Sequence, residues 1–155
     1  MINVVLVNPE IPPNTGNVGR LCVAVGATLH LVKPLGFHID DRSLKRAGLD
    51  YWKKLDLIVW DNFESYVRHT DQHKVVLTSS KRGDLYTRIN FRADDHIVFG
   101  PETRGLDTEA YRRFPDRIAR IPIRLDQVRS LNLSTSVGII VFEALRQTGA
   151  LDQLS

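Results

Sequence analysis

Short apolar stretches alternate along this chain with segments whose apolar residues repeat at helical spacing. The apolar stretches are too short for helices and are bounded by Gly, Pro or polar residues, which is typical of strands. They predict strands at Asn3–Val7, Thr28–Val32, Leu57–Trp60, Lys74–Thr78, His96–Phe99 and Ile118–Ile121. Between them, helices are predicted from about Asn17 to Gly26, over Arg42–Leu49 with Asp40 or Asp41 as cap, from the cap Asp61 to about His69, from the cap Asp107 to Phe114, and over Leu133–Gln147.

Strands that are apolar throughout, rather than alternating, are typical of a mostly parallel sheet that helices cover on both faces. The pattern therefore predicts an α/β fold. No repeat, low-complexity tract or long linker divides the chain, so residues 1–155 are expected to form one domain.

The last predicted helix follows an irregular loop of different chemistry. Residues 121–130 carry Arg124 and Arg129, and a helix cannot run through Pro122. Asn132 can accept the free amides of the first helical turn. The apolar face of this helix consists of Leu133, Val137, Ile140, Val141, Ala144 and Leu145. A polar loop held against a helix start offers a small ligand fixed backbone donors and a positive dipole end.

The predicted sheet also indicates where a ligand would bind. In parallel sheets, ligands bind beyond the carboxyl ends of the strands. Asn14 follows the first strand, Gly100 follows the strand at His96, and Ile121 ends the last strand. We therefore expect these three segments to meet at one edge of the sheet and to form a site.

Charge and composition narrow the classes of function. The 155 residues carry a formal net charge of +3, with basic clusters at residues 42–54 and 111–129. From spacing alone, these clusters are equally consistent with RNA phosphate binding and with a solvated surface. The start of the chain predicts a strand rather than a signal peptide, and no apolar run is long enough to cross a membrane. Cys22, the only cysteine, is expected to be a buried free thiol in a cytoplasmic protein.

Several candidate sites have structural alternatives. Gly16 and Gly19 fit neither a phosphate loop nor a dinucleotide fingerprint. Arg20 would lie in the first turn of a helix that begins near Asn17, where the dipole disfavours a cation, so it is expected to meet an anion. Glu102 fits either a ligand site or a surface turn in which it pairs with Arg104. A metal site at His69 and His73 has no evident third ligand, so no metal is expected.

Three segments together resemble one known class of enzyme. They are Asn14-Thr-Gly-Asn-Val-Gly-Arg20, Phe99-Gly-Pro-Glu-Thr-Arg-Gly-Leu106 and the stretch Ile121–Gln147. In order and spacing they resemble the SPOUT class of RNA ribose 2′-O-methyltransferases, nearly end to end. The resemblance implies a C-terminal trefoil knot, a homodimer and S-adenosyl-L-methionine as cofactor, without a metal.

The resemblance also assigns roles to individual residues. It implies that the cofactor is bound by Leu77, Thr78, Gly100, Glu102, Ile121, Ser130 and Leu131. It implies that Arg20, Asn14, Ser130 and Asn132 serve the transfer step. Arg20 is an unusual candidate for a general base because a free guanidinium hardly loses its proton. It is equally suited to orienting a substrate phosphate and stabilising the developing alkoxide.

Three further segments resemble one branch of that class in particular. They are Pro9–Asn17, Pro34–Phe37 and Lys45–Tyr51, and the branch methylates the wobble ribose of tRNA. The resemblance thus implies the tRNA anticodon loop as substrate, with a pyrimidine in leucine tRNAs as target. Two alternatives remain open from the sequence. One is the same chemistry at another tRNA position or on rRNA, and the other is an RNA-binding module without turnover.

Overall fold

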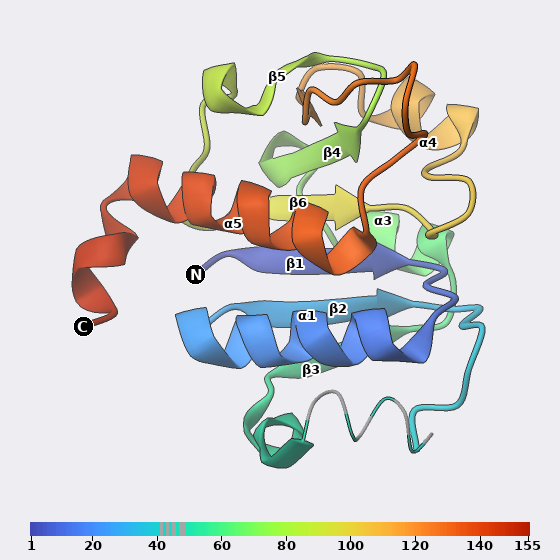
Figure 1. Ribbon diagram of the computed structural model, residues 1–155, viewed down its shortest axis with the longest axis vertical. Coiled ribbons are helices and arrows are strands. Elements are labelled where there is room, and N and C mark those ends of the chain that lie inside the picture. The colour runs from blue at the N-terminus through green and yellow to red at the C-terminus, as the bar shows by residue number, and fades with distance from the viewer. Residues whose placement is uncertain (41, 43, 45, 47–48) are drawn as a thin grey trace.

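The computed structural model describes the chain except for residues 41, 43, 45, 47 and 48. The helix predicted over Arg42–Leu49 and its cap at Asp40 or Asp41 therefore lie largely outside the described residues. Within the described part, seven strands form one parallel sheet in the order β3-β2-β1-β6-β4-β7-β5 (Figure 1). The strands are β1 Asn3–Val7, β2 Thr28–Val32, β3 Leu57–Trp60, β4 Val75–Ser79, β5 Asp84–Leu85, β6 His96–Phe99 and β7 Ile118–Arg120.

Helices lie on both faces of this sheet. They are α1 Pro12–Val25, α3 Phe63–Arg68, α4 Thr108–Arg113 and α5 Leu133–Thr148, with short 3₁₀ helices η1 Leu49–Lys54, η2 Gln72–Lys74, η3 Tyr86–Arg88 and η4 Ala150–Gln153. Figure 1 shows α1 and α5 side by side over the near face, with α3 and α4 behind the sheet. The predicted class, a parallel sheet covered by helices on both faces, is thus confirmed. The knot stays a prediction.

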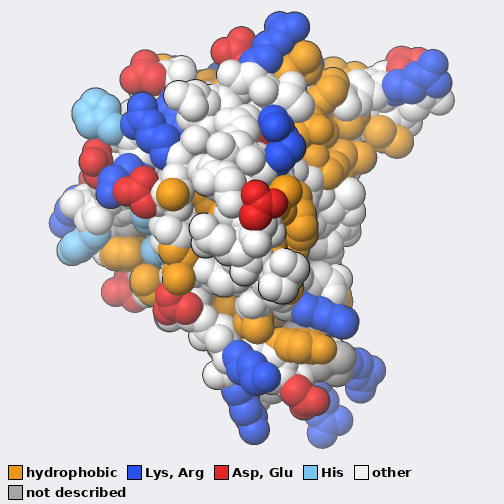
Figure 2. All heavy atoms as spheres, turned by 90° about the vertical axis from the view of Figure 1, so that its left-hand side faces the viewer, with side chains coloured by type: hydrophobic (Ala, Val, Ile, Leu, Met, Phe, Trp, Pro, Cys, Tyr) orange, Lys and Arg blue, Asp and Glu red, His pale blue; other side chains and the backbone are white. Residues whose placement is uncertain are grey.

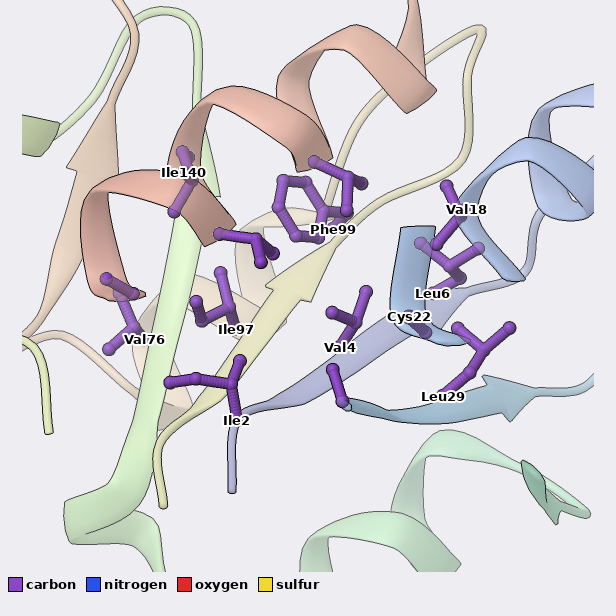
Figure 3. Close-up of a cluster of buried hydrophobic side chains, with 14 of the residues drawn as sticks. Ile2, Val4, Leu6, Val18, Cys22, Leu29, Val76, Ile97, Phe99 and Ile140 are labelled. Carbon is purple, nitrogen blue, oxygen red and sulfur yellow. The ribbon is translucent and has the colours of Figure 1, made fainter. Parts of the chain in front are cut away.

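The hydrophobic core is divided between the two faces. Under α1 and α5, side chains from β1, β2 and β6 pack with both helices, as Figure 3 shows for Leu6, Val18, Cys22, Ile97 and Ile140. A second cluster lies under α3 and α4 and is centred on Tyr66, which is fully buried.

Burial raises the pKa of the Cys22 thiol to about 12. No helix in the described part of the chain is long and apolar enough to cross a membrane.

The six predicted strands are confirmed within a residue or two, and β5 was missed. This strand has only two residues and no apolar run, so its sequence carries no strand signal. It exists because the chain before it approaches β7 closely. Gly83 has φ +86°, and a Cβ there would lie 2.2 Å from the carbonyl oxygen of Ile118. Backbone pairing with β7 follows from that approach.

The first helix begins earlier than the sequence analysis predicted. α1 starts at Pro12, five residues before Asn17, because prolines fit the first positions of a helix, where amides have no intrahelical partner. The argument that Arg20 occupies the first turn is therefore wrong. Arg20 lies about two turns into the helix, beyond the reach of the terminal dipole.

The caps of the other helices largely follow the prediction. Asp107 accepts a hydrogen bond from the amide of Ala110, and Asn132 accepts one from the amide of Thr135. The cap of α3 is Asn62, not Asp61, since the Asn62 side chain accepts from the amide of Ser65 at 2.7 Å. Gly149, with φ +73°, ends α5 in the left-handed conformation that glycine favours.

A buried histidine connects β2 to its neighbours on the α3 face. His30 is only 3% exposed. Its Nδ1 accepts a hydrogen bond from the Trp60 indole, so its Nε2 carries the proton and donates to Asn3 Oδ1, both at 3.0 Å. Burial, with a smaller contribution from the nearby His96, lowers the pKa of His30 to about 4, partly opposed by Asp56. The His30 ring is therefore uncharged in the folded protein at neutral pH.

Acidification should destabilise the protein through His30. In the unfolded chain the ring takes up a proton near its ordinary pKa of 6.5, whereas the folded protein resists protonation down to about 4. The free energy of unfolding should therefore fall as the pH decreases between these values. With about 1.4 kcal/mol per pKa unit, the loss attributable to His30 is up to about 3 kcal/mol. Urea unfolding at a series of pH values measures it.

Two variants isolate the contribution of His30. His30→Gln lowers stability at neutral pH but should flatten its decline between pH 6.5 and 4. His38→Gln is the control, because His38 lies exposed in the loop after β2, and it should leave the decline unchanged. An equal decline in wild type and His30→Gln would contradict the assignment.

Candidate active site

A cavity of about 350 Å³ lies beyond the carboxyl ends of the central strands. Its walls come from the segments after β4, β6 and β7 and from the first turns of α5. The lining residues include Thr78–Arg82, Phe99–Leu106, Ile121, Ile123, Arg129–Leu131, Leu133, Ser136 and Ile140. The volume is in the range of small-molecule sites. Ligand binding at this edge is what a parallel sheet predicts.

Most of the predicted cofactor residues line this cavity. Thr78, Gly100, Glu102, Ile121, Ser130 and Leu131 are among the lining residues. Leu77 is fully buried within β4, directly before the wall, so only its backbone is placed to contribute. A Cβ at Gly100 would lie 2.2 Å from the amide nitrogen of Leu106, so this wall can fold back on itself only with glycine there.

The loop after β4 adds residues that the sequence analysis did not single out. Ser79 Oγ accepts the amides of Lys81 and Arg82, each at 3.0 Å, which shapes a tight turn. The Arg82 guanidinium lies 4.7 Å from the ring centre of Tyr111, on α4. Tyr111 donates its hydroxyl to the carbonyl of Thr78 at 2.8 Å, and burial raises the pKa of that hydroxyl. The sequence predicts Ser79–Gly83 as a loop after a strand, and that position could have marked these residues for the site, whereas nothing in the sequence marks Tyr111.

The cavity rim is basic. Lys81, Arg82, Arg104 and Arg129 all line it, against the single lining carboxylate of Glu102. Such a rim attracts anionic ligands or an adjacent nucleic-acid backbone. Among the described residues, no three His, Cys, Asp or Glu side chains come together as a metal site.

The carboxylate of Glu102 holds the start of α1. It accepts the backbone amides of Glu10, at 2.9 Å, and of Ile11. Ile11 occupies the N-cap position but has no side-chain acceptor, and a residue distant in sequence satisfies the amides that lead into the helix. Among the described residues, the partners of this carboxylate are these two amides rather than Arg104, so the surface-pair alternative for Glu102 is wrong.

Asn14 and Asn132 are brought into contact although they lie far apart in the sequence. The Asn132 amide donates to Asn14 Oδ1 at 2.9 Å, while its own oxygen caps α5. Asn14 is 7% exposed. A single side chain therefore caps one helix and binds another, and it joins α1 to the α5 end of the cavity wall.

Arg20 lies apart from the cavity, on the exposed side of α1. Its guanidinium lies 5.0 Å from the ring centre of Tyr51, in η1. Gly19 allows this approach, because a Cβ there would lie 2.9 Å from the Trp52 ring. Gly19 therefore serves close packing of α1 against η1. The predicted site residues fall into a cavity group and an α1 group, joined by Glu102 and by the Asn14–Asn132 contact.

Comparison with known proteins identifies the class to which this fold and cavity belong. Residues 1–142 match the SpoU rRNA Methylase family, and the chain belongs to that family. This confirms the resemblance carried by the three sequence segments.

Curated relatives indicate a more particular activity. The chain is 48% identical over 153 residues to tRNA (cytidine(34)-2′-O)-methyltransferase of Burkholderia cenocepacia, covering 96% of this chain and 97% of the relative. It is 43% identical over 150 residues to the enzyme of the same name from Aeromonas hydrophila, covering 96% of each chain.

Solved structures are similar along nearly the whole chain. One, described as "Structural insights into the 2-OH methylation of C/U34 on tRNA", has a TM-score of 0.87 and 42% identity, covering 95% of this chain and 90% of the other. An AdoMet-bound rRNA methyltransferase from Sinorhizobium meliloti has a TM-score of 0.83 and 28% identity, covering 94% of this chain and 56% of the other.

Variants of Asn132 should separate its two contacts. Asn132→Ala removes both and should lower the free energy of unfolding by about 2 kcal/mol, through loss of the cap and of the partner of the buried Asn14 amide. Asn132→Ser keeps a capping oxygen on a side chain too short to reach Asn14, so it should lower the free energy of unfolding by only about 1 kcal/mol. Both variants should lose methyl-transfer activity, measured beside urea unfolding. Full activity in Asn132→Ser would show that the contact with Asn14 is dispensable.

Proposed function

We propose that this protein transfers a methyl group from S-adenosyl-L-methionine to the ribose 2′-hydroxyl of nucleotide 34, the wobble position, of tRNA. The observation that carries the proposal is the cavity at the carboxyl edge of the sheet. Its walls come from the segments Phe99–Leu106 and Ile121–Gln147, which resemble methyltransferases. A hydrogen bond from Glu102 connects it to the segment that leads into α1, the helix that bears Arg20. The wobble position is supported by the names of the relatives at 43% and 48% identity.

The cavity fits the cofactor in size and chemistry. Ile121, Leu133 and Ile140 supply apolar walls for an adenine ring. The backbone at Leu77, Gly100, Ile121 and Leu131 supplies polar groups, and the missing side chain of Gly100 lets the backbone approach closely. Bound there, S-adenosyl-L-methionine supplies an electrophilic methyl group. Thr78, Glu102 and Ser130 complete the binding set in this proposal, and no metal is needed.

The RNA would lie against the α1 side of the molecule. Arg20 and Tyr51 form a cation–aromatic pair there, and Lys53, Lys54 and Arg46 are exposed nearby in sequence. Figure 2 shows Lys and Arg side chains gathered at the lower end of one face, where η1 lies in Figure 1. Such a surface attracts RNA phosphates, and the Tyr51 ring can stack on an unpaired base. Single-stranded anticodon loops expose both groups.

Arg20 is proposed to orient the RNA and to stabilise charge rather than to act as a base. A ribose hydroxyl becomes a strong nucleophile only as its proton leaves, and a guanidinium does not accept that proton at neutral pH. The guanidinium can instead bind the phosphate beside nucleotide 34 and stabilise the oxyanion that develops on the ribose. The proton then passes to water. Asn14, Asn132 and Ser130 hold the reacting groups in place.

We also propose that the protein works as a homodimer in the cytoplasm, where tRNA is modified. Leu125, Val128 and Phe142 are 49%, 49% and 45% exposed, which leaves large apolar side chains without cover on the loop before α5 and on α5 itself. A second copy would cover them and share the tRNA surface. Leucine tRNAs with a pyrimidine at position 34 are the proposed substrates.

The decisive experiment is transfer of labelled methyl groups from S-adenosyl-L-methionine to separate pools of tRNA and rRNA, followed by mapping of the product. We expect a 2′-O-methyl group on nucleotide 34 of tRNA. Transfer to rRNA, or to another tRNA position, would overturn the substrate assignment but keep the chemistry. Binding of cofactor and RNA without any transfer would instead indicate a binding module.

Arg20→Ala should separate transfer from cofactor binding. Because Arg20 lies outside the cavity, the affinity for S-adenosylhomocysteine should change by no more than about twofold, while the transfer rate should fall by about a hundredfold or more. Arg68→Ala is the control, since Arg68 is an exposed arginine on α3, behind the sheet. A loss of cofactor affinity as large as the loss of rate would refute this division of roles.

A further inference from the structure

Glu10 and Glu102 hold each other's loops in a reciprocal arrangement. Glu102 accepts the amides of Glu10 and Ile11, and Glu10 Oε1 accepts both the amide of Thr103, at 3.1 Å, and its hydroxyl, at 2.8 Å. We call this set of four residues the carboxylate clasp. It closes a ring of hydrogen bonds between the loop after β6 and the segment that enters α1.

The clasp joins two parts of the site that otherwise have different tasks. Glu102 and Thr103 line the cofactor cavity. Two residues after Glu10, α1 begins, and it carries Asn14 and Arg20. A displacement of the cavity wall is therefore transmitted to the start of the helix through hydrogen bonds made in both directions.

The segment entering α1 is also confined from its other side. The amide of Gly36 donates to the carbonyl of Pro9 at 2.9 Å, and a Cβ on Gly36 would lie 2.8 Å from the Cα of Glu10. Residues 9 and 10 are thus held between the turn after β2 and the loop after β6. The turn after β2 holds only one side of the segment, so its alignment with the cavity wall depends on the clasp. The hydrogen bonds from Thr103 also hold the pKa of Glu10 below its ordinary value, because they favour the carboxylate that accepts them.

From this geometry we infer that Glu10 is a positioning residue that couples cofactor binding to RNA binding. A cofactor in the cavity fixes the wall at Glu102 and Thr103, and the clasp then fixes the start of α1, so that Arg20 meets the RNA in its working position. The inference rests on the proposed function and adds to it a coupling between the two binding events. RNA should bind more tightly after the cofactor, and, because coupling is reciprocal, the cofactor should bind more tightly in the presence of RNA.

The test measures tRNA affinity with and without saturating S-adenosylhomocysteine, which occupies the cavity without reacting. In wild type, the affinity should rise by about tenfold on addition of S-adenosylhomocysteine. Glu10→Ala should lose most of this increase and lower kcat, while its affinity for S-adenosylhomocysteine alone stays within about twofold of wild type. Glu10→Gln keeps an oxygen that can accept from Thr103, so it should restore the coupling.

Control variants distinguish coupling from general stability. Glu109→Ala removes an exposed carboxylate of α4 that pairs only with its helical neighbour Arg112 among the described contacts, and it should leave the coupling unchanged. Thr103→Val removes the donor hydroxyl and Thr103→Ser restores it. This second pair should reproduce the loss and the recovery even if Glu10→Ala unfolds.

The outcomes separate this inference from the proposed function. Wild type that methylates tRNA without any cofactor-dependent change in affinity would overturn the coupling and leave the function intact. The same holds if Glu10→Ala and Thr103→Val keep the full change. Wild type that neither binds nor methylates tRNA would instead refute the proposed substrate.

Discussion

The carboxylate at Glu102 is the interaction on which the arrangement of the site depends. Pro12 and Pro13 start α1 without amide hydrogens of their own, and Ile11 has no side chain able to cap the helix. The free amides just before the helix would remain unsatisfied unless an acceptor came from elsewhere in the chain. Glu102 supplies it from the cavity wall, and the negative charge also favours the helix end electrostatically. The cofactor cavity and the helix that carries Arg20 are therefore parts of one hydrogen-bonded unit.

A parallel sheet explains why segments so distant in sequence converge. The carboxyl ends of all strands lie at one edge of the sheet, so the loops after β1, β4, β6 and β7 meet there. These loops have no regular ladder to satisfy their polar groups, and they satisfy one another instead. Glu102 accepting the amides of Glu10 and Ile11, and Glu10 accepting the amide and hydroxyl of Thr103, are examples. Each such contact fixes the position of a site residue.

Much of the fold could be predicted from the sequence because its signals are local. The apolar strands and the caps Asp107 and Asn132 each act within a few residues. The cavity-lining positions of Gly100, Ile121 and Ser130 followed from their place after strands and from the resemblance to the family. The errors concern effects between distant segments. The predicted start of α1 near Asn17 is too late because the acceptor for the amides that lead into the helix, Glu102, lies about 90 positions away. β5 was missed because it forms only by pairing with β7.

Residues whose partners lie far away in the sequence were the hardest to find. Tyr111 lies on a short helix whose sequence is that of an ordinary amphipathic surface helix. Glu10 is a single acidic residue in a proline-rich loop. Their roles depend on partners that are 33 and 93 positions away, respectively. Sequence reading works by spacing and periodicity, and these contacts have neither.

The buried state of Cys22 has a practical consequence for measurements on this protein. With its side chain inaccessible and its pKa raised to about 12, the thiol is almost entirely protonated at neutral pH. A protonated, inaccessible thiol reacts very slowly with maleimides or oxidants. Since it is the only cysteine in the sequence, two cysteines engineered at exposed positions, one on α1 and one on the cavity wall, would take up fluorophores or spin labels alone. The natural chain thus already provides a nearly silent background for distance measurements between α1 and the cavity wall.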